Sequence, residues 1–145
     1  MTDETGLARF HQAQAPLYDT ILAELSAGRK RTHWMWFGFP QLRGLGHSAM
    51  AGRYGIASLS EARAYLADAI LGPRLIACTQ AVLAHPARTL AEIFGTPDDM
   101  KFISSMTLFA IASGSVEGVF QTALARYNSG RSDERTVALL AMQER

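Results

Sequence analysis

Residues 96–113 read TPDDMKFISSMTLFAIAS, and this stretch predicts the helix around which the rest of the fold packs. Thr96 is a favourable cap, and Pro97 suits the first helical position. Asp98 and Asp99 would face the positive end of the helix dipole, so we interpret them as helix-start residues rather than as catalytic carboxylates. Beyond them the helix is apolar nearly all the way round, which is typical of a helix in the middle of a fold.

One narrow strip of this helix is polar. Lys101, Ser104 and Ser105 are separated by three and four positions and therefore lie on the same side. The strip either faces water as a solvated edge or lines a cavity. In a cavity, Lys101 would act as a point charge for a phosphate or a carboxylate, and the two serine hydroxyls would donate or accept hydrogen bonds.

Apolar residues recur at helical spacing along most of the chain. Ser58 with Glu61, and Thr89 with Glu92, match the capping box that opens a helix. Together these signals predict two short helices before residue 28 and further helices at about 59–68, 71–85, 90–94, 116–127 and 137–141. A strand, if one forms, is short and lies near residues 33–39. We therefore expect one compact all-α domain over residues 1–145, with seven or eight helices.

The composition is that of a small folded domain. The chain has 145 residues, which suits a single core, and 48% of them are hydrophobic. Fourteen basic and thirteen acidic residues leave a formal charge of +1. This charge is far from that of proteins that hold duplex DNA through many phosphates, so it argues against a nucleic-acid partner.

The only cysteine, Cys78, excludes an intrachain disulfide and a thiolate zinc site, and its place on an apolar helix face suggests an inert core residue. The first residues lack the apolar stretch of a secretory signal, and no apolar run approaches the ~20 residues of a membrane helix. We therefore expect a soluble, cytoplasmic protein. No histidine pair has helical metal-site spacing, and Gly44-x-Gly46 lacks the rest of a dinucleotide fingerprint, so we expect neither a metal nor a cofactor.

The most unusual segment is residues 33–41, HWMWFGFPQ, which holds both tryptophans. It lies between Leu25 and Ser60, in a stretch that contains five Lys or Arg residues and no Asp or Glu. Aromatic rings beside uncompensated positive charge suit an anion attached to a flat ring, such as a nucleotide. The basic triplet at residues 29–31 is by itself typical of a solvated helix end.

Several side chains of this segment are candidate ligand contacts. Trp34 and Trp36 would stack on a ring, and Gln41 would add a hydrogen bond. Arg43, in the glycine-containing loop that follows, would hold a phosphate. The alternative is that the aromatic rings fill the core, which their size suits equally well.

Two blocks of the sequence resemble a known bacterial family. They are HWMWF with FPQ over residues 33–41 and SSMTLF over residues 104–109. With these motifs the chain is similar, over roughly residues 6–140, to the domain of unknown function 1810, whose members are often automatically labelled calpastatin. The resemblance implies a compact multihelical fold, no established activity and no assigned catalytic residue. The calpastatin label does not fit, because the animal calpain inhibitor resembles a disordered polymer and this composition is typical of a folded globule.

The sequence supports three functional hypotheses. The first is a pocket for a nucleotide-like or other anionic small molecule, in which His33 would transfer protons and Lys101 would stabilise negative charge if a reaction occurs. The alternative is a protein–protein interaction module without catalytic activity, for an unidentified partner. The third, RNA binding, would use the acid-free stretch and its rings as a stacking platform.

Overall fold

The computed structural model describes residues 6–144, and its regular elements are all helices. The ten helices of this range are α1 (Ala8–Gln14), α2 (Tyr18–Ser26), α3 (Met35–Gly38), α4 (Ala49–Tyr54), α5 (Leu59–Ala67), α6 (Leu71–Leu83), α7 (Leu90–Phe94), α8 (Asp98–Ser113), α9 (Val119–Asn128) and α10 (Glu134–Gln143). Among the described residues, the one extended pairing is an isolated parallel bridge between Leu42 and Ile56. The all-α class predicted from the sequence is confirmed.

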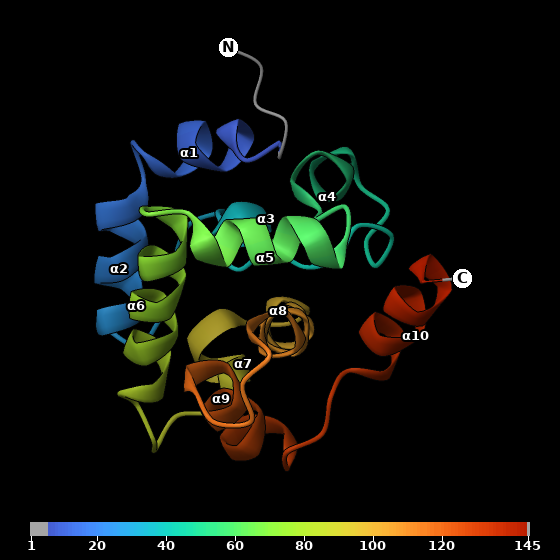
Figure 1. Cartoon of the computed structure of the whole chain (residues 1–145). Helices are drawn as coiled ribbons and strands as arrows, with labels where there is room; N and C mark the ends of the chain where they lie inside the picture. The colour runs from blue at the N-terminus through green and yellow to red at the C-terminus, as the bar shows by residue number, and fades with distance from the viewer. Residues whose placement is uncertain (1–5, 145) are drawn as a thin grey trace.

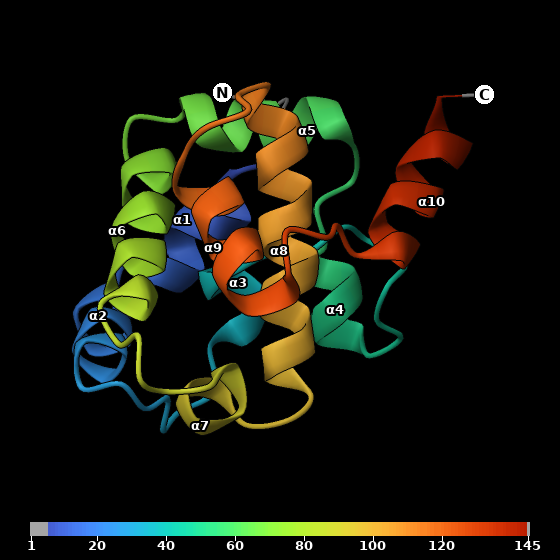
Figure 2. The same ribbon diagram turned by 90° about the horizontal axis from the view of Figure 1, so that it is seen from below.

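Helix α8 lies at the centre of the fold, as its apolar sequence predicts. Figure 2 shows it lengthwise, with α5 crossing one end and α9 beside it, and α5, α7, α9 and α10 all pack against it. Phe102 and Phe109 are completely buried in this packing. Pro97 takes the cap position instead of Thr96, and the Thr96 hydroxyl donates a hydrogen bond to the Asp99 carboxylate (3.3 Å) rather than capping a backbone amide.

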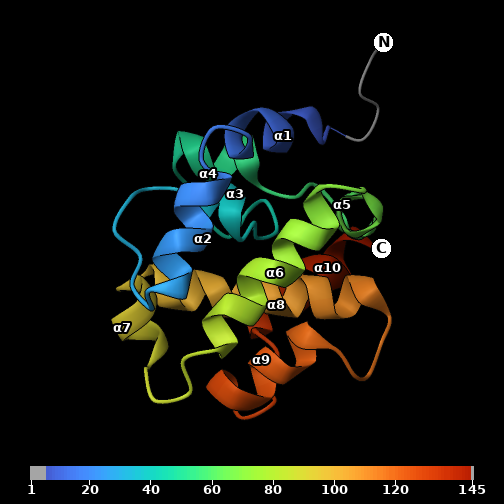
Figure 3. The ribbon, with the colours of Figure 1, turned by 90° about the vertical axis from the view of Figure 1, so that its left-hand side faces the viewer.

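Helices α5 and α6 meet at a sharp corner with a bend of 88° (Figure 1). Gly72 makes this corner possible, because a Cβ atom there would lie 2.2 Å from the carbonyl oxygen of Leu66. Helix α6 runs beside α2 (Figure 3) and buries Cys78, so the interpretation of this cysteine as a core residue is confirmed. In the described part of the chain, no single helix has the length and apolar composition to cross a membrane. Only α5 and α6 taken together, as a bent pair, have that length and composition.

The two predicted capping boxes differ in the structure. At α7, Thr89 and Glu92 form the full reciprocal box. At α5, the Ser58 hydroxyl accepts a hydrogen bond from the Glu61 amide (3.2 Å), but the Glu61 carboxylate instead pairs with Arg9 at 2.7 Å. The same Glu61 oxygen also accepts a hydrogen bond from the Ala57 amide (3.0 Å), one residue before the cap, so the second box is only half formed.

The number of helices exceeds the seven or eight that the sequence predicts. The two unpredicted helices, α3 and α4, contain four and six residues. An element this short has no complete amphipathic repeat, so hydrophobic periodicity does not detect it. The extended segment considered near residues 33–39 is replaced by the single turn of α3.

A close approach inside the aromatic segment fixes this turn. Trp34 precedes α3, and its ring lies against Gly38, where a Cβ atom would come within 2.5 Å of the ring carbon Cε3. Phe39 then points into the core and meets the rings of Phe94 and Phe102 edge-on, with centroids 5.6 and 5.1 Å away. The segment therefore folds back on itself instead of extending.

Trp34 is buried and is held by a carboxylate. Its indole Nε1 donates a 2.9 Å hydrogen bond to Oε1 of Glu24, which lies on α2. The same carboxylate accepts hydrogen bonds from the amides of Arg31 (2.7 Å) and Thr32 (3.0 Å) and from the Thr32 hydroxyl (2.7 Å). Burial by itself raises the pKa of Glu24, but these hydrogen bonds outweigh it and lower the pKa to about 2. One carboxylate thus ties α2, the loop that follows and Trp34 together.

We expect Glu24→Gln to lower the free energy of unfolding at neutral pH by about 2–3 kcal/mol, because a neutral amide accepts these bonds less strongly and brings in an unneeded donor. The contribution of Glu24 is present above its ordinary pKa of 4.5 and is lost as the pH falls toward about 2, because folding lowers this pKa. Urea unfolding of both proteins from neutral to strongly acidic pH measures the effect.

Glu144→Gln is the matched control, because Glu144 is exposed near the end of the chain. It should leave the free energy of unfolding unchanged at every pH. The role assigned to Glu24 is wrong if the Glu24→Gln protein is as stable as the wild type at neutral pH and loses as much stability as the wild type in acid.

Cys78 gives a second prediction about the core. Burial raises the pKa of its thiol to about 12, and the side chain is 3% exposed. Because the thiolate is the reactive form, we expect the native protein to react far more slowly with Ellman's reagent at mildly alkaline pH than the urea-unfolded protein does. Equal rates before and after unfolding would show that the thiol is accessible.

Candidate functional site

A hollow beside the first turns of α8 collects several of the side chains predicted from the sequence. Its volume is about 210 Å³. Lys101 and Ser104 come from α8, Gln41 from the loop after α3, and Arg135 from α10. The rest of the lining is formed by Leu45, Gly46, Pro97, Met100 and Asp133. We call this site the Lys101 hollow.

A much smaller cavity adjoins the Lys101 hollow, and Gln41 and Lys101 line both. Its volume is about 10 Å³, and its other walls include Trp36 and Tyr54. A space of this size holds about one water molecule. The structure therefore brings Trp36, Gln41, Lys101 and Ser104 together around two adjoining cavities, although they come from two stretches distant in the sequence.

Lys101 shares its counter-ion with a second lysine. The Asp98 Oδ2 atom lies 3.1 Å from the Lys30 Nζ, and the Asp98 Oδ1 atom lies 3.6 Å from the Lys101 Nζ. The side chain of Lys30 is 8% exposed and that of Lys101 is 31% exposed. The Lys30 Nζ also lies 5.3 Å from the centre of the Trp34 ring, in cation–π contact. Two positive charges therefore share one carboxylate, and the more exposed of them faces the hollow.

The α10 side of the Lys101 hollow adds another cation. The Arg135 Nη2 donates a 3.2 Å hydrogen bond to the carbonyl oxygen of Leu45, an uncharged partner that leaves the charge of the guanidinium uncompensated. Asp133 also lines the hollow, but its Oδ2 accepts hydrogen bonds from the amide (3.0 Å) and the hydroxyl (2.6 Å) of Thr136. This carboxylate serves mainly as the cap of α10.

The other predicted site residues line neither cavity. Trp34 is 1% exposed, and Ser105 is completely buried with no hydrogen-bond partner for its Oγ among the described residues. Arg43 donates to two carbonyl oxygens at the end of α4, each at 3.1 Å. His33 is exposed in the loop before α3. In residues 6–144, no three His, Cys, Asp or Glu side chains are arranged to hold a metal ion.

Sequence reasoning missed the residues that arrange this site. The interpretation of residues 29–31 as a solvated helix end is wrong for Lys30, which is buried against Asp98. Asp98 does begin α8, but it also pairs with both lysines. Glu24 had a detectable signal, because the indole of Trp34 needs an acceptor and Glu24 is the acid that immediately precedes the acid-free stretch. Arg135 carries no such signal.

Comparison with known proteins connects the chain to proteins whose function is not established. A crystal structure, that of the conserved hypothetical protein Rv1873 from Mycobacterium tuberculosis, is 57% identical in sequence, and the match covers 96% of this chain and 99% of that chain with a TM-score of 0.92. No curated protein matches the chain. Residues 4–140 match the model of the family described as protein of unknown function (DUF1810), so the resemblance seen in the sequence is confirmed and the chain belongs to this family.

Proposed function

We propose that the Lys101 hollow binds a small anion, with Lys101 and Arg135 as the positive charges and Gln41 and Ser104 as hydrogen-bonding groups. The observation that carries this proposal is the convergence of two cations, from α8 and α10, on one hollow of about 210 Å³. Charge-assisted hydrogen bonds from such a pair are the usual means of holding a phosphate or a carboxylate.

The charge of Lys101 is available to a ligand because Lys30 is a second, closer partner of Asp98. Coulomb energy falls with distance, and Lys30 approaches Asp98 more closely than Lys101 does, 3.1 Å against 3.6 Å. Lys30 is also buried, so it has little freedom to leave the pair. Lys101 can therefore turn toward an anion without leaving Asp98 unpaired.

The size of the hollow limits the ligand. Sites for drug-sized molecules usually occupy about 300–1,000 Å³. The Lys101 hollow is smaller, at about 210 Å³, and the cavity beside Trp36 has no room for a base in this conformation. The geometry thus favours a phosphate or carboxylate group on a small molecule, and a nucleotide would enter with its phosphate alone.

A binding role fits this geometry better than a catalytic one. Lys101 is placed to stabilise negative charge, as expected from the sequence. His33 lies outside the lining, so a proton-transfer role for it finds no support there. The one cysteine, Cys78, is free and buried, which suits a reducing compartment. We therefore infer that the protein works in the cytoplasm and that its ligand is an anion found there.

We expect Lys101→Gln and Arg135→Gln each to weaken the binding of inorganic phosphate by about tenfold, because each removes one charge-assisted hydrogen bond. Titration of the backbone amide NMR signals with phosphate, and in parallel with AMP, measures this. Arg63→Gln is the matched control, because Arg63 is exposed on α5 and its loss changes the net charge equally. Equal affinities for Lys101→Gln and Arg63→Gln would refute the proposed site.

Asp98→Asn should have the opposite effect. Removing the carboxylate that competes for Lys101 should tighten phosphate binding on the order of threefold, while the loss of the Lys30 partner lowers the thermal stability. The same NMR titration, combined with a melting curve, separates the two effects. A folded Asp98→Asn protein that binds phosphate more weakly than the wild type would contradict the charge balance described above.

A further inference from the structure

The central helix α8 is left uncovered along one part of its surface. Met100 is 66% exposed, although eight of the sixteen residues of its helix are buried. Met100 and Ile103 are shared by two open hollows on this side, one of about 510 Å³ between α7, α8 and α9 and one of about 400 Å³ toward α10. We call the combined depression the Met100 trough.

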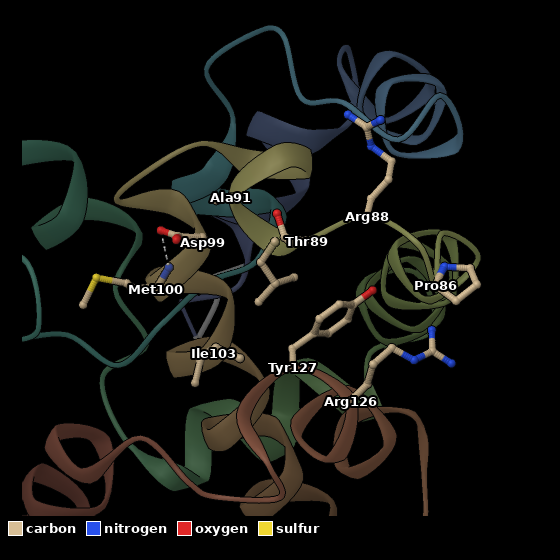
Figure 4. A pocket seen from close by; sticks show the side chains of 10 residues that line it. Pro86, Arg88, Thr89, Ala91, Asp99, Met100, Ile103, Arg126 and Tyr127 are labelled. Atoms are coloured by element: carbon tan, nitrogen blue, oxygen red, sulfur yellow. Dashed lines mark hydrogen bonds between the residues drawn. The ribbon is translucent and has the colours of Figure 1, made fainter.

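The floor of the Met100 trough is apolar. Met100, Ile103 and Tyr127 all line the larger hollow, and Figure 4 shows Ile103 of α8 near Tyr127 of α9, while the Met100 side chain extends away from Tyr127. Leu90 of α7 also lines this hollow and is half-buried. Met100 is the strongly exposed apolar side chain of this floor, and a partner that covered it would remove its apolar surface from water.

The rim of the trough is positively charged. Arg88 and Arg126 line the larger hollow, and Arg131 and Arg135 line the smaller one. None of these four guanidinium groups forms an ion pair with a described residue, since the four ion pairs of residues 6–144 involve Arg9, His11, Lys30 and Lys101. Arg126 donates instead to the carbonyl oxygen of Leu83 (2.5 Å), which leaves its charge uncompensated.

The carboxylates of the trough offset this charge only in part. Asp99 accepts a hydrogen bond from its neighbouring amide at the start of α8 (2.9 Å), and Asp133 caps α10. Glu134 is exposed in the first turn of α10. These three acids sit at the positive ends of helices, where the dipole offsets part of their charge, and the four arginines leave the rim with an excess of positive charge.

We propose that the Met100 trough is the docking site for an acidic segment of a partner protein, whose apolar residues cover Met100 and Ile103 while its carboxylates pair with Arg126 and Arg131. The rim charge favours an acidic occupant over a basic one. The floor has a single aromatic ring, that of Tyr127, and the whole chain has a formal charge of only +1. Both features favour a protein segment over a nucleic acid, which needs more cations and stacking rings. The trough shares Met100, Asp133 and Arg135 with the Lys101 hollow, but Arg126 and Arg131, the proposed partners of the carboxylates, do not line that hollow.

The test uses defined peptides and fluorescence anisotropy. A fluorescein-labelled peptide that alternates leucine and glutamate pairs is compared with the same peptide carrying lysine in place of glutamate, and with a short oligouridine. We expect the wild-type protein to bind the acidic peptide at least about tenfold more tightly than the other two probes. Equal binding of both peptides, or tighter binding of the oligouridine, would overturn the proposal.

Substitutions locate the site. Met100→Glu and Arg131→Glu should each weaken binding of the acidic peptide by about tenfold, because they place negative charge on the floor and on the rim. Met142→Glu and Arg63→Glu are the matched controls, since both residues are exposed outside the trough and should leave the affinity unchanged. All four residues are exposed, so circular dichroism should show wild-type folding. If the two trough variants bind like their controls, the docking site is not the Met100 trough.

Two further measurements separate this surface from other interpretations. Lys101→Gln should leave peptide binding unchanged, so a failure of the anion site and a failure of the docking site are distinguishable. Light scattering during size-exclusion chromatography shows whether the protein self-associates. A wild-type dimer that Met100→Glu converts to a monomer would identify a second copy of the chain as the occupant and overturn the assignment to an acidic partner.

Discussion

The hydrogen bond between the buried indole of Trp34 and the carboxylate of Glu24 is the constraint on which the arrangement of this protein depends. A buried indole N–H and a buried carboxylate are each costly alone, because both lose their hydrogen bonds to water. Together, and with the amides of Arg31 and Thr32, they satisfy one another. This pairing holds the chain between α2 and α3 in place. The loop that carries Gln41 comes directly after α3 in the sequence.

A chain of charged side chains connects the buried Trp34 to the surface. Lys30 contacts the ring of Trp34 and the carboxylate of Asp98, and Asp98 also contacts Lys101. The acid-free stretch therefore receives its counter-charges from outside, from α2 and from the first turn of α8. This arrangement explains how a segment rich in cations can pack against the core and still leave one lysine free enough to face a hollow.

Much of the fold could be predicted from the sequence because its helices carry local signals. The capping box at Thr89 and the apolar length of residues 97–113 each specify a helix without reference to the rest of the chain. Helices α3 and α4 could not be predicted this way, because the turn of α3 depends on the contact between Trp34 and Gly38 rather than on periodicity.

The candidate site was predictable only in part, and for a related reason. The spacing of Lys101 and Ser104 shows that they share one side of a helix, and the structure does bring them to one hollow with Gln41. No pattern shows which of two neighbouring tryptophans enters the core. That choice depends on Glu24, which supplies an acceptor to Trp34 and leaves Trp36 at the wall of the small cavity. Arg135 reaches the hollow only through the tertiary placement of α10.

The central claim is that Glu24 and Trp34 stabilise the fold as a coupled pair. A double-mutant cycle with Glu24→Gln, Trp34→Phe and the combined variant, followed by urea unfolding, measures their coupling directly. We predict a coupling free energy of about 1.5–3 kcal/mol, as expected for a buried hydrogen bond to a charged group. Additive effects, within about 0.5 kcal/mol, would show that the two residues act independently and would contradict the account.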